Sequence, residues 1–216
     1  LACPQLWKSA LWGTPRDAAL IERLKSLPQL REQANKFNWI IGEGIQINGG
    51  DENPGPWLEG MRLIPSDQVR SYFLDMTVGE TIKEKVFHRP RTPELTKAPL
   101  VLIQQSQCVA SFSSVDVAYR HTISGITAHP EQEWLLWWLI AYINSPLAKY
   151  YHFLTSTRWA VERGNIIQRE YEEMPLQLPY RDDPRLQKIL AHLGRIKELL
   201  EQEELFSQEE KEAAIK

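Results

Sequence analysis

The sequence predicts an α+β fold with a helical arm at its C-terminal end. Residues 100–103 form a continuous apolar run, which is typical of a buried strand. Residues 131–143 and 146–154 have the composition of helices, and the second follows an Asn-Ser pair with Pro146 at its first position, which favours a helix N-terminus. Because buried strands and capped helices both occur, the class is α+β.

The first third of the chain predicts one helix and several strands. Residues 17–35 are expected to be helical, with Thr14 as the cap, Pro15 at the first position and an interruption at Pro28. The helical spacing is carried by Leu20, Ile21, Leu24 and Leu27. Short apolar stretches predict strands at residues 39–47, 58–64 and 69–74, with a Gly/Pro-rich loop at 49–56. Residues 87–93 are expected to be extended, since two prolines disfavour helix there.

The rest of the chain predicts neighbours for the buried strand and a final helix. Residues 109–112, 115–119 and 121–126 are expected to be strands beside residues 100–103. The final helix begins at Asp182-Asp183-Pro184 and carries about two heptads of an a/d seam. Its members are Leu186, Ile189, Leu193, Ile196 and Leu200. We expect this seam to pack on another helix, namely the helix at 17–35, a second copy of the chain or a missing subunit.

Composition permits a globular domain and leaves nucleic-acid binding open. The chain has 216 residues, 43% hydrophobic content and eight Trp, enough for one large domain or one domain with an appendage. The net charge of −3 differs from the basic surface typical of DNA-binding proteins. However, residues 83–120 hold six Lys/Arg against three acids, residues 149–169 hold four against one, and residues 198–212 hold seven acids against one Lys. The overall acidity therefore lies partly in the tail, and two local basic segments remain.

Cysteine, histidine and hydropathy patterns exclude several classes. Cys3 and Cys108 are far apart and outside any CxxC motif, so we expect free thiols and a cytoplasmic protein. No pair of His has metal-ligand spacing, so no metal site is expected. The apolar run at 134–143 is too short for a membrane span, and no membrane partner is expected. The chain begins with Leu, so we expect a piece excised from a longer protein.

Two motifs around residues 141–179 resemble the target-recognition domains of DNA restriction-modification systems. These domains occur in type I specificity subunits and in the specificity regions of adenine methyltransferase-endonuclease fusions (type IIG). The first motif, a helix with the pattern NSKLAxYY, is matched by Asn144, Ser145, Leu147, Ala148, Tyr150 and Tyr151. The second, a closing segment before a long helix, is matched by Ile167, Glu170, Met174, Pro175, Leu176, Leu178 and Pro179. The segment LWKSALWGTPRD at 6–17 is similar to the lead-in of such domains.

The resemblance implies a fold, a function and partners. It implies a lead-in at residues 1–38, a mixed-sheet target-recognition domain at 39–180 and a C-terminal helical arm at 181–216. The expected function is sequence-specific recognition of double-stranded DNA for an N6-adenine methyltransferase domain or subunit. S-adenosylmethionine is the cofactor implied for that parent enzyme, and no cofactor is expected in this chain. Helix–helix self-association through the seam is a further expectation.

Two segments have the side chains that DNA recognition requires, and two more are weaker candidates. Arg suits guanine, Asn and Gln suit adenine, and cations suit phosphates. The loop after the first motif holds Thr157, Arg158, Arg163 and Asn165. Arg89 and Arg91 alternate around a Pro, so we expect both to point to one face. Gln105 follows the buried strand, and Arg120 stands beside Tyr119. A solvated charged loop or a surface turn is the alternative interpretation for these residues.

Catalytic motifs are not found in the sequence. Asn144-Ser145-Pro146-Leu147 lacks the second Pro and the aromatic residue of a base-holding NPPY loop, and Gly42-Glu43-Gly44 does not continue into a dinucleotide fingerprint. Ser113, Asp116 and His121 lack a nucleophile elbow. The chain alone is therefore not expected to be an enzyme. Alternative hypotheses are a protein-interaction module that uses the C-terminal helix without binding DNA, and an enzyme of unrecognised type.

Overall fold

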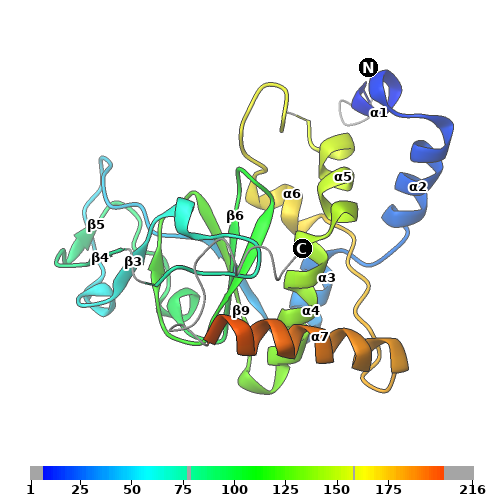
Figure 1. The fold of residues 1–216 in the computed structure, drawn as a ribbon. Helices are drawn as coiled ribbons and strands as arrows, with labels where there is room; N and C mark the ends of the chain where they lie inside the picture. Colours follow the sequence, from blue (N-terminus) through cyan, green and yellow to red (C-terminus); the bar gives the residue numbers. More distant parts are fainter. Residues whose placement is uncertain (1–6, 77–78, 158, 202–216) are drawn as a thin grey trace.

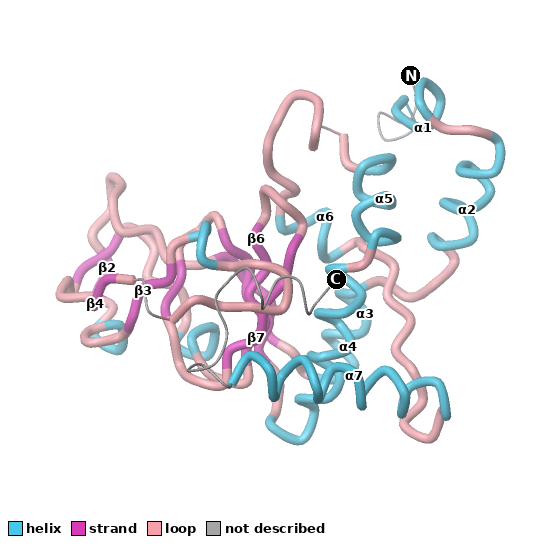
Figure 2. Tube along the Cα trace, viewed as in Figure 1, coloured by secondary structure: helices cyan, strands magenta, loops and turns pink. Residues whose placement is uncertain are grey.

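The computed structural model describes residues 7–76, 79–157 and 159–201, with all their side chains except those of Leu200 and Glu201. The fold is α+β, as the sequence predicts. Figures 1 and 2 show a central sheet with most helices gathered on one side of it and a group of short strands on the other. Among the described residues, no helix combines the length and apolar composition needed to cross a membrane.

The central sheet has four strands in the order β1-β9-β6-β7, and every neighbouring pair is antiparallel. The strands are β1 (Ile40–Glu43), β6 (Leu100–Gln104), β7 (Val109–Ser113) and β9 (Ile123–Thr127). Every residue of β6 and β9 is buried, which confirms the prediction of a buried strand at 100–103. The predicted strands at 39–47, 109–112 and 121–126 are also confirmed, with shifted ends.

Short strands form two smaller sheets beside the central one. In the first, β3 (Arg62–Ile64) pairs antiparallel with β4 (Glu80–Thr81) and parallel with β8 (Ala118–Tyr119). In the second, β2 (Asn53–Pro54) pairs with β5 (Val86–Phe87). Turns of 3-10 helix are η2 (Pro56–Leu58), η3 (Ser66–Gln68), η4 (Pro93–Thr96) and η5 (Pro130–Gln132). The mixed pairing expected of the fold is therefore found in a small sheet.

One strand prediction is wrong in its partner and another is wrong altogether. Within residues 115–119 the strand β8 forms, but it pairs with β3 and is not a neighbour of β6. Residues 69–74 form a tight reversal in which Val69 and Leu74 bridge each other. Tyr72, at the tip of this reversal, has a left-handed backbone with φ 64° and bridges Ser111 of β7. A left-handed residue cannot continue a strand, so the apolar pattern at 69–74 reflects packing and not strand pairing.

From residue 7 onward, the helices before the central sheet are α1 (Trp7–Trp12), α2 (Pro15–Lys25) and α3 (Leu30–Phe37). The predicted cap of α2 is confirmed, since the Thr14 amide donates to Asp17 Oδ2 at 2.7 Å and the Asp17 amide donates to Thr14 Oγ1 at 3.4 Å. The chain breaks between α2 and α3 near Pro28, as predicted. Helix α3 ends at Asn38, which has a left-handed φ of 56°.

Helix α4 (Glu133–Asn144) packs on β7 and β6 of the central sheet, and α5 (Pro146–Thr155) packs on α4 and α1. The ring of Trp137 stacks on Phe112 of β7 with centroids 4.7 Å apart. The predicted cap is confirmed, since Ser145 Oγ accepts from the Ala148 amide at 3.2 Å. Asn144 binds the edge of the sheet. Its Oδ1 accepts from the Ala110 amide at 2.9 Å, and its Nδ2 donates to the Ala110 carbonyl at 2.8 Å.

The closing segment contains α6 (Gln168–Glu172) and leads to α7 (Pro184–Glu201). Helix α7 contacts α4, and Lys197 Nζ on α7 is 3.0 Å from Glu133 Oε1 on α4. Leu193 is 5% exposed and belongs to the core cluster that includes α4, so the middle of the seam packs on a helix as predicted. Leu186 is 1% exposed, and the side chain of Leu200, the last seam residue, lies outside the described part of the chain. The contacted helix is α4, which was not among the three expected partners. The apolar face of α4, hydrophobic over most of its length, accounts for this pairing.

Candidate nucleic-acid interface

One end of the central sheet collects most of the segments that the sequence marks as candidate DNA contacts. Strands β1 and β6 end there and strands β7 and β9 begin there, because Glu43 pairs with Ser124 and Gln104 pairs with both Ile123 and Val109. The segments that continue from these strand ends, together with two that join them, form a surface that we call the rim. The rim consists of residues 44–47, 88–91, 104–108, 119–122, 156–157 and 159–166.

Backbone hydrogen bonds join the rim segments in series. The amide of Ile166 donates to the carbonyl of Gln105 at 2.9 Å. The amide of Gln105 in turn donates to the carbonyl of Thr122 at 3.4 Å. The amide of His121 donates to the carbonyl of Ile45 at 3.0 Å. The next link is a pair of bonds between Gln46 and Arg89, at 2.9 and 3.0 Å. The segments are thus held side by side although they are far apart in the sequence.

A glycine permits the tightest approach in this row. A Cβ atom placed on Gly44 would overlap the carbonyl oxygens of Tyr119 and Arg120, so no larger residue fits without moving one strand away from the other. Tyr119 is itself buried, and its hydroxyl donates to the Leu95 carbonyl at 3.0 Å. Desolvation raises the pKa of Tyr119 well above its usual value, so this group stays a neutral donor.

The loop between α5 and α6 is fixed at its base. The indole Nε1 of Trp159 donates to the Ser106 carbonyl at 3.0 Å, and the Trp159 amide donates to Ser156 Oγ at 3.2 Å. The carboxylate of Glu170 accepts from the amides of Thr157 and Ile167 at 3.2 and 3.1 Å. Thr157 thus lies in the base of the loop, half-buried, with its amide already engaged. These contacts connect the loop both to the turn after β6 and to α6.

The tip of the same loop stands away from the body of the chain. Figure 1 shows it in yellow, rising between α6 and α5. The Ala160 amide donates to the Arg163 carbonyl at 3.1 Å and closes a turn in which Ala160 has a left-handed φ of 64°. Arg163 and Asn165 are exposed, and a Cβ placed on Gly164 would meet no atom within 4 Å. Arg158, also predicted to contact DNA, lies outside the described residues.

Two further arginines of the rim have free guanidinium groups. Arg89 and Arg120 are exposed, and like Arg163 they form no side-chain hydrogen bond or ion pair with any residue that the structure describes. Their backbones are fixed by the row of hydrogen bonds, while their side chains remain available. Three cations from three distant segments therefore share one end of the sheet.

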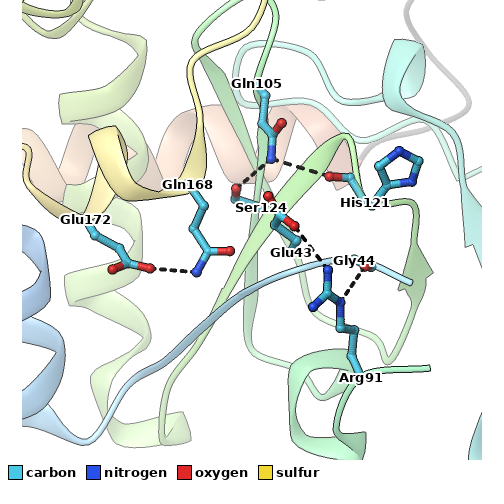
Figure 3. A network of polar contacts seen from close by, with 8 residues as sticks. All are labelled: Glu43, Gly44, Arg91, Gln105, His121, Ser124, Gln168 and Glu172. Atoms are coloured by element: carbon cyan, nitrogen blue, oxygen red, sulfur yellow. Dashed lines mark hydrogen bonds and ion pairs between the residues drawn. The ribbon is translucent and has the colours of Figure 1, made fainter. Parts of the chain in front are cut away.

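Two other predicted contact residues are engaged inside the chain, as Figure 3 shows. Arg91 Nη2 is 3.1 Å from Glu43 Oε2, and Arg91 Nε donates to the Gly44 carbonyl at 3.0 Å. The extended geometry expected for residues 87–93 ends at Arg91, whose φ is 63°, so Arg91 lies in a different environment from Arg89. Gln105 is buried, and its Nε2 donates to Ser124 Oγ at 3.1 Å. Both side chains hold the rim together.

The residues that organise the rim differ in how far the sequence marks them. Glu170 is marked by its position three residues after Ile167, which is the spacing of a helix cap. Nothing local marks Trp159 or Ser106, since their contact joins residues 53 positions apart. No group of three or more His, Cys, Asp or Glu suited to a metal ion occurs in the part of the chain that the structure describes.

Comparison with known proteins gives structural neighbours and no sequence relatives. No family model and no curated protein matches the sequence. Among solved structures, the HsdS subunit from Thermoanaerobacter tengcongensis is 12% identical, with a TM-score of 0.41 over 91% of this chain and 48% of that one. A chain from a structure of a type I R-M system, described in terms of complex assembly and conformational transition, is 12% identical, with a TM-score of 0.39 over 93% and 52%. The chain spans about half the length of these neighbours.

Proposed function

We propose that this chain is a sequence-recognition module for double-stranded DNA. It supplies specificity to an N6-adenine methyltransferase, or to a methyltransferase-endonuclease, of a restriction-modification system. Catalysis belongs to a separate domain or subunit that uses S-adenosylmethionine, because this sequence has neither a base-holding loop nor a glycine-rich turn for the methyl donor. The motifs at 141–154 and 167–179 support this proposal by their resemblance to such modules.

The observation that carries the proposal is the arrangement of the rim. Arg89, Arg120 and Arg163 come from three segments that the backbone hydrogen bonds place in one row. Groups with fixed backbones and free guanidinium ends suit contacts to DNA, where phosphate contacts orient the protein and base contacts read the sequence. Arg163 and Asn165 at the protruding tip are the proposed base readers, since Arg pairs with guanine and Asn with adenine. Arg89 and Arg120 are the proposed phosphate contacts.

The net charge of −3 is compatible with DNA binding at the rim, because the acidic residues of the chain are unevenly distributed. Seven of them lie at residues 198–212, beyond most of the described structure. The alternative hypothesis, a protein-interaction module using the seam of the last helix, is less favoured. Leu186 and Leu193 of that seam are already buried within the chain, so they are not available to a partner.

The test is DNA binding by the purified chain and by arginine variants. Fluorescence anisotropy with a labelled double-stranded DNA of random sequence, between about 50 and about 200 mM salt, should give a steep loss of affinity. Changing Arg89 or Arg120 to Gln should weaken binding to all sequences and reduce the salt slope by about 1. Arg163→Ala should cost about 1–3 kcal/mol at the preferred site and relax selection at one base pair.

The matched control is Arg185→Gln on α7, where the side chain is 92% exposed and lies outside the rim. It should leave both affinity and salt slope near the wild-type values. The preferred site is obtained by rounds of selection from a random duplex pool. Absence of salt-dependent binding by the chain, or an Arg185 variant as impaired as the Arg89 and Arg120 variants, contradicts the proposal.

A further inference from the structure

Directly under the base of the protruding loop lies a buried lysine. Lys8 is on α1, its residue is 0% exposed, and its Nζ donates a hydrogen bond to the carbonyl of Trp159. The ammonium group also lies 5.5 Å from the ring centroid of Phe153 on α5 and 6.0 Å from that of Trp7. Lys8 and Trp159 are 151 positions apart, so this bond joins the first described helix to the loop.

A buried ammonium group is costly unless it is well bound. Desolvation lowers the pKa of Lys8, and the carboxylate of Glu170 opposes this effect. Glu170 is the same residue that accepts hydrogen bonds from the amides of Thr157 and Ile167. The positive charge of Lys8 and the negative charge of Glu170 therefore both act on the base of one loop. The burial of the Lys8 ammonium group is therefore better explained by its hydrogen bond to the Trp159 carbonyl than by packing alone.

Trp159 is held between two elements. Its carbonyl accepts from Lys8 of α1, and its indole donates to the Ser106 carbonyl in the turn after β6 at 3.0 Å. The residues that follow, 160–165, are exposed. The direction in which the tip leaves the body is therefore set at Trp159, and a displacement there moves Arg163 and Asn165 together.

We propose that Lys8 is a positioning residue for the loop, one that acts through the Trp159 carbonyl to set where Arg163 and Asn165 stand. The DNA-reading part of this inference rests on the proposed function, whereas the anchoring part does not. The lead-in helix α1 is accordingly a component of the recognition apparatus. Its Lys8 is not a DNA contact, because the side chain is buried under the loop.

The experiment replaces Lys8 with Met, which keeps an unbranched chain of similar length and removes the charged donor. The matched control is Lys197→Met, the same chemical change at a lysine of α7 whose Nζ is bound to Glu133 of α4. Limited trypsin digestion with mass spectrometry then follows cleavage after Arg163, which requires the loop to open locally. Melting temperatures of both variants show how far each change destabilises the whole chain.

Cleavage after Arg163 should be roughly tenfold to a hundredfold faster in Lys8→Met, the range expected for losing a hydrogen bond to a charged group. In Lys197→Met the rate of cleavage after Arg163 should change little, even where the melting temperature falls as much as in Lys8→Met. Lys8→Gln, with a shorter neutral donor, should fall between wild type and Lys8→Met. Equal cleavage after Arg163 in Lys8→Met and Lys197→Met overturns the proposal.

A measurement on the wild-type chain covers the case in which Lys8→Met does not fold. The ¹⁵N–¹H signal of the Lys8 ammonium group should be protected from exchange with water, unlike those of exposed lysines. An unprotected signal overturns the proposal. If the chain binds DNA, Lys8→Met should also lose more affinity for the selected site than for random DNA, and equal losses overturn the reading part. If the chain binds no DNA, the proposed function fails while the digestion and NMR results still decide the anchoring.

Discussion

At the scale of the single residue, His152 is a neutral group enclosed in the core. It lies on α5, is 1% exposed, and meets the ring of Tyr171 edge-on with centroids 5.0 Å apart. Its Nε2 has no hydrogen-bond partner among the described residues. Burial lowers the pKa of His152 to about 3, because the charged imidazolium form would lose its hydration. The imidazole therefore stays uncharged over the whole neutral range.

This predicts an acid sensitivity with a definite sign. The unfolded chain protonates His152 near its usual pKa of 6.5, whereas the folded chain does so only near 3. The contribution of neutral His152 to stability is therefore fully present above pH 6.5 and is lost as the pH falls toward 3. Between these values the free energy of unfolding should fall by about 1.4 kcal/mol per pH unit from this residue. Urea unfolding of wild type and His152→Leu at several pH values measures the difference in slope.

His192→Leu serves as the control, since it makes the same substitution at an exposed site on α7. All three proteins contain the same carboxylates, so the comparison is between the two histidine sites. NMR gives an independent check. A His152 signal that titrates near pH 6.5 in the folded chain would show that the imidazole is accessible to protons and that the prediction is wrong.

The sequence predicts which residues of the loop between α5 and α6 are exposed better than it predicts which side chains bind each other inside the chain. The Gly-Asn turn and its Arg mark residues 163–165 as a loop, and these residues are exposed. The environment of Arg91 could not be predicted, because its carboxylate partner Glu43 is 48 positions away. The same holds for Lys8 and Trp159, which are 151 positions apart. A local pattern reports what a side chain can do, and the fold decides which partner it meets.

At the scale of the element, α7 is an amphipathic helix whose seam is covered by its own chain. Leu193 is 5% exposed, and Ile189 and Ile196 pack against the same core cluster. The heptad spacing therefore predicts that α7 packs on a helix, but it does not predict that this helix is α4. The a/d spacing describes a stripe, and any apolar helix of the right length can cover it.

Replacing Leu193 and Ile196 with Ser should lower the stability of the chain. Truncating a buried Leu costs about 2–5 kcal/mol, and the half-buried Ile196 should cost less. The melting temperature, followed by circular dichroism, should fall by several degrees, at about 2–4 °C per kcal/mol for a chain of this size. His192→Ser with Arg195→Ser is the control on the exposed face of the same helix. An unchanged melting temperature in the Leu193/Ile196 variant would mean that α7 does not pack on α4 in solution.

Elements with a local cause were predicted from the sequence, and elements with a distant cause were not. Thr14 with Asp17, and Ser145 before Pro146, start their helices by contacts within three residues. The strand β8 depends instead on β3, more than fifty positions earlier, and so its departure from the central sheet has no local signal. The reversal at 69–74 is fixed by Tyr72 on β7, which is again a contact between distant segments.

At the scale of the whole molecule, recognition and catalysis are expected to be separate. The sequence has no loop for a flipped base and no glycine-rich turn for a methyl donor, so the purified chain should not methylate DNA. The measurement is transfer of labelled methyl groups from S-adenosylmethionine to mixed-sequence DNA, with an active adenine methyltransferase as the positive control. Labelled adenine produced by the chain alone would contradict both this prediction and the proposed division of labour.

The asparagine of the first motif has a consequence for the behaviour of the molecule in concentrated solution. Strand β7 lies at one edge of the central sheet, and open edges invite strand addition and aggregation. Asn144 occupies both backbone groups of Ala110, and the Tyr72 amide binds the same carbonyl at 2.8 Å. An amide side chain imitates a neighbouring strand here, since it donates and accepts at once. The Ala110 amide and carbonyl, which a strand from another copy would need for pairing, are therefore already occupied within the chain.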